Sequence, residues 1–341
     1  MKVLLAEPWW GGSHRQWAEG YRNHSSYEVR VISRPGTHWR RRMKTAGEEL
    51  AAEANQIITR GWTPDVILAT DMMDLATFRK RLNTRLPTIL YMHENQLTYG
   101  ATIDINHGRI NARSVAAADL TVFNSQYHWS SFGEALMALD HPLALAAWHS
   151  ATIIPVGMDL SEVRLGETQD GPANVVWNHR WEPDKAPDRF ADALDVIDNL
   201  DWSLTLLGER DRSAAIDRIR SRFSDRIVHD GWAEPRQYLD LLGRGTIVVS
   251  TANQEFFGVS VAEAVASGCF PIVPNRLAYP ELLGSPLVDG TLYEGDLGPH
   301  LRWAIEHPEA LRMGREVLAA RMQRYDWSTI APMMDLALTS I

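Results

Sequence analysis

Short apolar runs alternate with helical segments along this chain, and the alternation occurs as two successive series. The first series has five runs that predict buried parallel strands, at residues 2–6, 27–32, 65–69, 88–92 and 120–123. The second series starts after Gly171 and predicts strands at residues 174–177, 203–207, 226–229, 246–249 and 270–273. Parallel strands need helical crossovers, so the sequence predicts an α/β protein with two doubly wound, Rossmann-like domains.

The length of 341 residues also fits two domains better than one. We expect an N-terminal domain over residues 1–165, a polar linker, and a C-terminal domain over residues 173–326. Residues 327–341 have the pattern of an amphipathic helix. Two doubly wound domains that face each other leave a cleft at the carboxyl ends of their strands, where ligands bind. Motifs that come directly after strands are therefore the candidates for function.

Composition and charge limit the class of protein. The single cysteine, Cys269, excludes an internal disulfide framework, and no apolar run reaches the length of a membrane-spanning helix. We therefore expect a cytoplasmic protein without stable membrane association. The net charge is −9, but residues 1–115 hold 16 Lys and Arg against 11 Asp and Glu, whereas residues 161–341 hold 18 against 28. This asymmetry is consistent with an anionic partner for the N-terminal half. A chance distribution of solvated charges explains it equally well.

Two glutamates, Glu255 and Glu263, bracket the most distinctive motif of the second series. Glu255 precedes a predicted helix, Glu263 lies inside it, and Gly258 lies at its start. A helix N-terminus offers free backbone N–H groups and the positive end of the helix dipole, which suit a phosphate. Two carboxylates beside such a site can hold the hydroxyls of a sugar nucleotide. The alternative is that Glu263 is an ordinary solvated or capping residue.

The block over residues 254–273 resembles the donor-binding motif of retaining GT-B glycosyltransferases of family 4. The resemblance implies a GT-B fold. It also implies that Glu255 is a catalytic residue that binds hydroxyls of the transferred hexose, and that Glu263 holds the ribose. The residues that would contact the donor in the loop and the first helical turn are Phe257, Gly258, Val259 and Ser260.

Two cations, Arg180 and Lys185, follow the predicted strand at residues 174–177. Similar glycosyltransferases place an arginine and a lysine at this turn, where they neutralise the nucleoside diphosphate that leaves. We therefore expect both to be catalytic, with no metal ion and no other cofactor required. The alternative is an exposed pair at a helix start, which is common on protein surfaces.

A glycine pair follows the first strand of the chain. Gly11 and Gly12 would let the backbone approach the donor closely. Ser13 and His14 come next and are candidate acceptor contacts. Ser13 can also cap the following helix, and both roles are compatible.

A second polar motif, residues 93–96, follows the predicted strand at residues 88–92. Polar residues at the carboxyl end of a parallel strand indicate a ligand cleft. Similar glycosyltransferases have a histidine here near the reacting carbon, so His93 is a candidate catalytic residue, and Glu94, Asn95 and Gln96 are candidate acceptor contacts. The alternative is a structural histidine. His93 and Glu94 lack the spacing of a metal site.

The segment over residues 34–44 predicts a basic loop with an interleaved aromatic ring. Such a composition is typical of a contact to a nucleic-acid backbone with a stacking ring. The candidate acceptor contacts in it are His38, Trp39, Arg40, Arg41 and Arg42. A solvated basic loop is the alternative.

Five motifs together are similar to those of the tRNA-queuosine α-mannosyltransferases, at residues 10–14, 38–40, 93–97, 179–185 and 255–258. This resemblance covers nearly the whole chain. It implies GDP-mannose as the donor, the cyclopentenediol of queuosine in tRNA-Asp as the acceptor, and retention of the anomeric configuration without a nucleophilic side chain. One alternative is a family 4 enzyme with another sugar nucleotide and a lipid, polysaccharide or other nucleoside acceptor. Another is a catalytically silent RNA- or nucleotide-binding protein.

Overall fold

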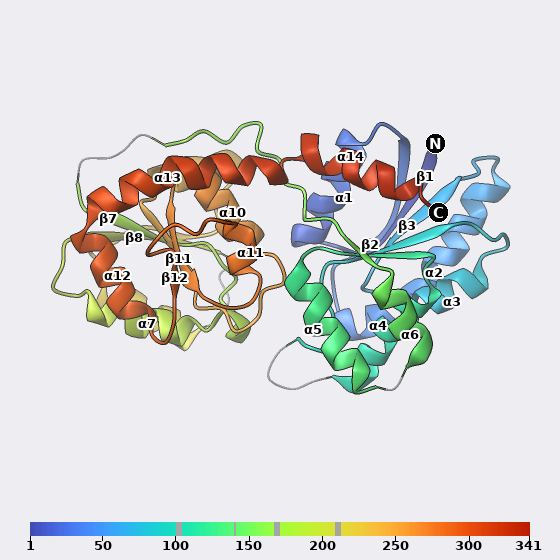
Figure 1. The fold of residues 1–341 in the computed structure, drawn as a ribbon, viewed down its shortest axis with the longest axis horizontal. Helices are drawn as coiled ribbons and strands as arrows, with labels where there is room; N and C mark the ends of the chain where they lie inside the picture. The colour runs from blue at the N-terminus through green and yellow to red at the C-terminus, as the bar shows by residue number, and fades with distance from the viewer. Residues whose placement is uncertain (100–103, 140, 167–170, 209–212) are drawn as a thin grey trace. The chain divides into compact units, whose positions relative to one another are not determined.

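The computed structural model describes residues 1–99, 104–139, 141–166, 171–208 and 213–341. The chain forms two compact units, each built around its own parallel sheet (Figure 1). Unit 1 comprises residues 1–158 and 325–341, and unit 2 comprises residues 159–324. Among the described residues, no helix is long and apolar enough to span a membrane.

The sheet of unit 1 has the strand order β2-β1-β3-β4-β5-β6, and all neighbours are parallel. Its strands are β1 (Lys2–Trp10), β2 (Glu28–Pro35), β3 (Val66–Thr70), β4 (Thr88–Met92), β5 (Leu120–Phe123) and β6 (Thr152–Ile153). The five strands expected from the apolar runs are confirmed. The sequence did not reveal β6, because two residues are too few to show a pattern.

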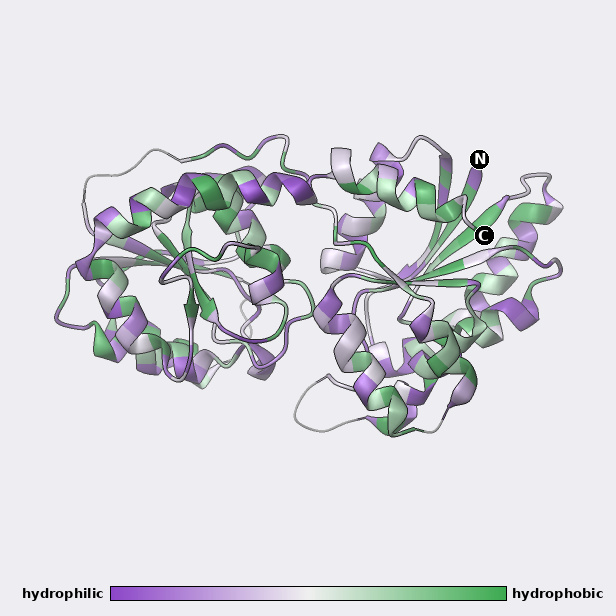
Figure 2. Cartoon of the chain, in the orientation of Figure 1, coloured by the Kyte–Doolittle hydropathy of each residue, from purple (hydrophilic) through white to green (hydrophobic). Residues whose placement is uncertain are grey.

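Helices cover and connect these strands, and they are α1 (Gly12–His24), α2 (Trp39–Thr59), α3 (Leu75–Arg81), α4 (Ile105–Ala117), α5 (Gln126–Met137), α6 (Pro142–His149) and α14 (Trp327–Leu338). The central strands β3 and β4 are buried along their whole length. Strands covered on both faces read as continuous apolar runs, which is why they were recognisable. Figure 2 shows this contrast between hydrophobic strands and helices of mixed hydropathy.

The C-terminal helix α14 packs on α1 within unit 1. The Tyr21 hydroxyl donates a hydrogen bond of 2.7 Å to the Asp335 carboxylate. Trp327 lies against Gly20 so closely that a β-carbon there would be 2.1 Å from the indole nitrogen. A side chain at residue 20 would therefore displace this helix.

Unit 2 has a second parallel sheet, in the order β12-β11-β10-β7-β8-β9. Its strands are β7 (Ala173–Trp177), β8 (Trp202–Leu207), β9 (Ile227–Gly231), β10 (Ile247–Val249), β11 (Phe270–Pro274) and β12 (Leu292–Tyr293). Its helices include α7 (Pro187–Val196), α8 (Ala214–Arg222), α9 (Pro235–Arg244), α10 (Val259–Ala266), α11 (Tyr279–Leu283), α12 (Leu297–Glu306) and α13 (Pro308–Met322). The five predicted strands are again confirmed, and the two-residue β12 was not predicted.

Candidate active site

The loop before α10 in unit 2 has the geometry of an anion-binding helix start. Gly258 is the N-cap residue of α10 with φ of 102°, a left-handed conformation that favours glycine. A β-carbon at this position would lie 3.1 Å from Leu282 and 3.3 Å from Tyr279. No side chain of the described residues caps the helix. The amides of Val259 and Ser260 therefore lie at an open N-terminus, which suits a phosphate.

Lys185 and Glu255, both predicted to be catalytic, meet beside this loop. The 3-10 turn η1 (Pro183–Lys185) buries the Lys185 ammonium, which donates a 2.9 Å hydrogen bond to the Gln254 carbonyl. The same nitrogen lies 3.2 Å from the Glu255 carboxylate and 3.3 Å from that of Asp184. Burial lowers the pKa of Lys185, but the charges of Glu255 and Asp184 outweigh it and the net shift is upward. The site thus contains a fixed positive charge.

Arg180 lies at the exposed edge of the same cluster. Its side chain is 55% exposed, with Nη1 3.2 Å from the Glu182 carboxylate and Nη2 3.7 Å from that of Asp184. Asp184, which sequence reasoning missed, therefore links both predicted cations. Its backbone carbonyl also accepts a 2.7 Å hydrogen bond from the Asn253 amide, which ties η1 to the loop before α10.

The carboxylate of Glu263 is held by partners that the sequence did not reveal. The Tyr238 hydroxyl, on α9, donates a 2.8 Å hydrogen bond to it, and the Asn178 amide group donates to that hydroxyl at 3.2 Å. Asn178 also donates to the Ser260 carbonyl at 2.6 Å, and the Ser260 hydroxyl pairs with His179 at 3.1 Å. Burial raises the pKa of Glu263 to about 7, while the bond from Tyr238 acts in the opposite direction.

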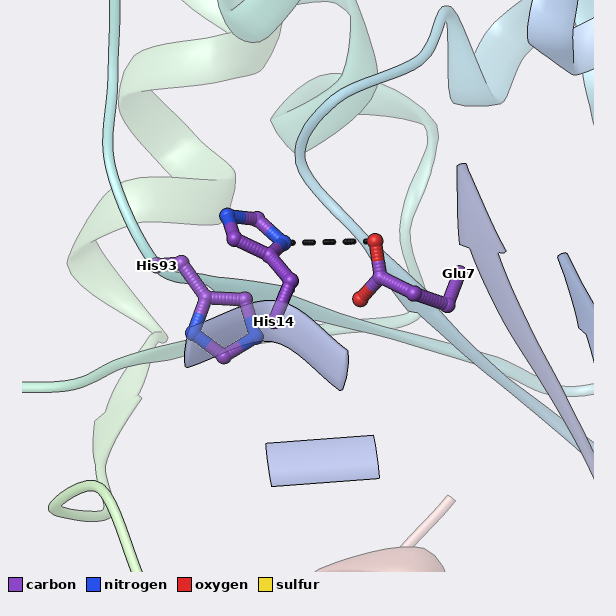
Figure 3. Close-up of side chains that lie close together, drawn as sticks. All are labelled: Glu7, His14 and His93. Carbon is purple, nitrogen blue, oxygen red and sulfur yellow. Dashed lines mark hydrogen bonds and ion pairs between the residues drawn. The ribbon is translucent and has the colours of Figure 1, made fainter. Parts of the chain in front are cut away.

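Three polar residues of unit 1 converge near the carboxyl ends of β1 and β4 (Figure 3). His14 Nδ1 lies 3.2 Å from a carboxylate oxygen of Glu7, which is fully buried within β1. The ring of His14 lies beside that of His93, with 4.3 Å between centroids. The Glu7 carboxylate also accepts hydrogen bonds from the Trp9 amide at 2.8 Å and the Thr70 hydroxyl at 2.9 Å.

This cluster contains one positive charge. Burial alone lowers the pKa of His14, but Glu7, through its charge and its hydrogen bond, raises it to about 9, with Asp71 and Glu94 adding to the effect. The pKa of His93 is shifted the other way, well below its usual value, by burial and by the charge of His14. At neutral pH the cluster therefore has a protonated His14 beside a neutral His93.

The ligand atoms of Glu7, His14 and His93 lie within 4.8 Å of one another. A carboxylate and two imidazoles are a donor set that a divalent cation can use. In this structure the contact between Glu7 and His14 has the length of a hydrogen bond, with a proton between the two groups. Because the pKa of His14 is raised to about 9, we assign the arrangement as an ion pair.

The loop after β4 positions His93 through its backbone. The His93 amide donates to the Asp71 carboxylate at 2.8 Å, and its carbonyl accepts from Asn124 at 2.9 Å. Asn95 and Gln96, predicted to contact the acceptor, are buried. The Asn95 oxygen accepts hydrogen bonds from the amides two and three residues later, so this side chain builds the loop. Glu94 accepts a 2.9 Å hydrogen bond from the Gln96 amide group.

The glycine pair lies at the start of α1. Gly11 is the N-cap residue and Gly12, with φ of 51°, begins the helix. Ser13 is exposed within the first turn and does not cap the helix, so the capping alternative is wrong. The reason is that the helix starts two residues earlier than a Ser13 cap would require.

The basic segment is not the loop that was expected. Helix α2 begins at Trp39, so Arg40, Arg41 and Arg42 lie in its first turns. Arg34 ends up paired with Glu49 at 3.1 Å and with Glu53 at 2.6 Å, and Arg42 also pairs with Glu49 at 3.0 Å. These acids lie farther along α2, so their ion pairs connect Arg34 and the first turns of the helix to its later turns. Arg34 and Arg42 are therefore neutralised inside the protein.

The outer face of this basic segment, by contrast, has exposed side chains. Arg40 is 69% exposed and stacks over the Trp39 ring at 4.4 Å. Trp39 in turn meets the ring of His107 edge-on at 5.2 Å. His38 is exposed in a left-handed conformation, and Arg41 is exposed without an ion pair to any described residue. A stacked aromatic with exposed cations beside it remains available for a nucleic-acid backbone.

The charge asymmetry of the sequence does not extend over the whole of unit 1. The parts of this unit outside residues 1–115 contain no lysine or arginine. They add five acids, Asp119, Glu134, Asp140, Asp326 and Asp335. Unit 1 therefore has no net charge, and its basic residues gather locally, at the start of α2 and at the end of α3.

Sequence reasoning missed several residues of these clusters, chiefly Glu7, Asp71, Asp184, Asn178 and Tyr238. A signal existed for Glu7, because a carboxylate within an apolar strand is rarely buried without a partner. Asp71 likewise follows directly after β3, at the carboxyl edge of the sheet. No comparable signal marks Tyr238, which reaches Glu263 from a different helix.

Two family profiles match the chain. The profile described as tRNA-queuosine alpha-mannosyltransferase N-terminal matches residues 2–144, and that of glycosyl transferases group 1 matches residues 173–307. A tRNA-queuosine alpha-mannosyltransferase of Drosophila melanogaster is 32% identical over an alignment of 320 residues, and the match covers 82% of this chain and 81% of the relative.

Solved structures share the fold at low sequence identity. Sucrose-phosphate synthase from Thermosynechococcus elongatus has a TM-score of 0.78 at 16% identity, with 99% of this chain and 98% of that chain covered. HepE of Anabaena, in complex with UDP, has a TM-score of 0.74 at 16% identity, with 100% of both chains covered. Fold and profiles together define a glycosyltransferase with the GT-B fold, as the sequence predicted. The chain belongs to the tRNA-queuosine alpha-mannosyltransferase family.

Proposed function

We propose that this glycosyltransferase moves mannose from GDP-mannose to the cyclopentenediol of queuosine in tRNA-Asp, with retention of configuration and without a metal ion. The observation that carries the proposal is the buried Lys185 ammonium, 3.2 Å from Glu255 and close to the open start of α10. The acceptor is supported by family membership, since the Drosophila relative is named for this activity. The proposal places the protein in the cytoplasm with its tRNA.

On the donor side, the reaction increases the negative charge on the departing diphosphate. Lys185, Arg180 and the first amides of α10 would stabilise that charge with groups that are already in place, which makes a metal ion unnecessary. Glu255 would accept hydrogen bonds from hexose hydroxyls, and ionised Glu263 would accept them from the ribose. Gly11, Gly12 and Phe257 would contribute close backbone or loop contacts.

The transfer itself needs no nucleophilic side chain. The bond between the sugar C1 and the phosphate oxygen breaks through an oxocarbenium-like state, and the acceptor hydroxyl attacks the same face. The departing phosphate oxygen takes the proton of that hydroxyl, so the products are the mannosylated nucleoside and GDP. His93 would lie beside the hexose as a neutral hydrogen-bonding group.

The acceptor side would use the start of α2. Arg40, Arg41 and Lys44 are exposed there, next to the Trp39 ring, and could contact the tRNA backbone. Ser13, His14, His38 and Glu94 remain candidate acceptor contacts.

A donor panel tests the proposal. Queuosine-bearing tRNA is incubated with GDP-mannose, UDP-glucose or UDP-galactose in the presence of EDTA, and the digested nucleosides are analysed by mass spectrometry. We expect a hexose on queuosine with GDP-mannose alone. Transfer from a UDP-sugar would refute the donor, and transfer that requires added divalent cations would refute metal independence.

A further inference from the structure

We propose that Glu7 and His14 form a positioning ion pair, which holds a positive charge against the ring of His93 and thereby keeps His93 neutral for its part in sugar transfer. This inference rests on the proposed function. Neither residue of the pair needs to touch the substrate for this role. Both would act through His93.

Glu7 is buried at a position where a charge needs a partner. Its carboxylate is fully buried inside a strand, a position that is costly for a charge unless it is paired and hydrogen-bonded. Three donors satisfy it: the His14 ring at 3.2 Å, the Trp9 amide at 2.8 Å and the Thr70 hydroxyl at 2.9 Å. Only one of these donors can bring a compensating charge. A neutral His14 would leave the carboxylate without a compensating charge, so we infer that His14 is protonated.

The position of His93 is the second argument. Its ring centroid lies 4.3 Å from that of His14 and 4.8 Å from that of Trp17, which meets it edge-on. Its backbone is fixed on both sides by Asp71 and Asn124. Burial already lowers the pKa of His93, and a second positive charge at this distance would be repelled, so the charge on His14 lowers that pKa further. His93 Nε2 has no hydrogen-bond partner among the described residues, and we infer that it is reserved for the substrate.

Other titratable groups face the pair and must be considered in any test. Asp71, after β3, and Glu94, after β4, raise the pKa of His14, whereas His128, on α5, lowers that of His93. Asp71 is itself buried, with a pKa raised to about 7, so it changes charge within the same range. A pH profile alone would not separate these groups, and direct observation of the histidines is needed.

The first test is an NMR titration of the whole protein with 15N-labelled histidine, and the His14→Gln and His93→Gln variants assign the signals. We expect His14 to remain protonated until about pH 9 and His93 to remain neutral down to the lowest pH at which the protein is folded. In Glu7→Gln the pKa of His14 should fall, because burial still lowers that pKa and the charge of Glu7 no longer raises it. The matched control is Glu19→Gln, which removes an exposed carboxylate paired with Arg15 on the same helix and should change neither signal.

The second test is the pH dependence of kcat for sugar transfer. Because His93 stays neutral in the wild-type protein, we expect no loss of activity from its protonation on the acid side of the profile. In Glu7→Gln and in His14→Gln the charge beside His93 is reduced or absent, so the pKa of His93 should rise and activity should fall at acid pH. His14→Gln serves if Glu7→Gln does not fold.

Three results would overturn the inference: a His14 that titrates at or below its ordinary pKa, a protonated His93 at neutral pH, or an unchanged profile in Glu7→Gln. A stoichiometric divalent metal in the purified protein, together with loss of activity on chelation, would show that Glu7, His14 and His93 form a metal site and not an ion pair. Failure of the proposed function looks different. In that case the NMR titrations follow the expectation, but no mannose is transferred to tRNA.

Discussion

At the scale of single residues, Lys185 is the group on which the donor side depends most. It is buried, it lies between Glu255 and Asp184, and it remains a cation because those carboxylates outweigh the effect of burial. A charge held in this way needs no reorganisation when the diphosphate leaves.

Lys185→Ala should lower kcat/KM by about 2–4 kcal/mol of transition-state stabilisation, a typical loss for one preorganised group. The loss arises because the developing charge is no longer neutralised and because Glu255 and Asp184 then repel the donor. Steady-state kinetics with labelled donor measures it, and thermal unfolding shows whether the variant is folded. Lys80→Ala, on the exposed side of α3, is the matched control. Wild-type turnover in Lys185→Ala would remove the basis of the donor assignment.

Tyr238→Phe should shift the pH dependence of donor binding upward. The Tyr238 hydroxyl lowers the pKa of Glu263, which burial has raised to about 7, so its removal raises that pKa further. Ionised Glu263 would bind the ribose, so the KM for the donor should increase at pH 7 and recover at higher pH. Measurement of KM between pH 6 and pH 9 tests this, and an unchanged profile would show that Glu263 does not act as an ionised ligand.

At the scale of elements, α2 shows where sequence reasoning reached its limit. The basic residues at its start suggest a loop, but Arg34 and Arg42 pair with Glu49 and Glu53, which lie later in the chain. Local composition does not reveal such tertiary pairs. These pairs separate the arginines into two sets. Arg34 and Arg42 are paired and stabilise the helix, whereas Arg40 and Arg41 stay exposed for contact with tRNA.

Arg41→Gln and Arg42→Gln should therefore have different effects. Arg41 is exposed, so its loss should weaken tRNA binding and reduce the slope of log affinity against log salt by about one, as for one phosphate contact. Arg42 pairs with Glu49, so its loss should lower the melting temperature more than the affinity. Filter binding across a salt series and thermal unfolding separate the two. Equal loss of affinity in both variants would contradict the division.

The strands, unlike the start of α2, could be predicted from local sequence. Ten of them were predictable because buried parallel strands read as unbroken apolar runs, and the loops that follow them contain the candidate residues. Lys185 and Glu255 were recognisable because each lies in a local motif. Their direct contact, and the bond from Tyr238 to Glu263, join positions far apart in the chain, which no local pattern encodes.

At the scale of the whole molecule, the shifted pKa values make stability depend on pH. Glu263 is an acid with a pKa raised from 4.5 to about 7, so the stability it contributes is lost as the pH rises through 7. His14 is a base with a pKa raised from 6.5 to about 9, so its contribution is complete below 6.5 and is lost as the pH rises through 9. Both groups favour the folded state at the lower pH.

The melting temperature should therefore fall between pH 6 and pH 9.5. His14→Gln should remove the part of this fall that lies above pH 7, and Glu263→Gln the part around pH 7. Thermal unfolding in buffers of matched ionic strength measures both. A melting temperature that rises over this range would show that the two groups are not perturbed as the structure indicates.

The central proposal is that this protein transfers mannose to queuosine in tRNA. The most direct measurement uses GDP-mannose labelled in the sugar and tRNA-Asp prepared with and without queuosine, with wild-type protein and Lys185→Ala side by side. We predict label in the queuosine-bearing tRNA with the wild-type protein, little with Lys185→Ala, and none in the tRNA that lacks queuosine. Equal labelling of both tRNAs, or no labelling of either by a protein that binds GDP-mannose, would contradict the account.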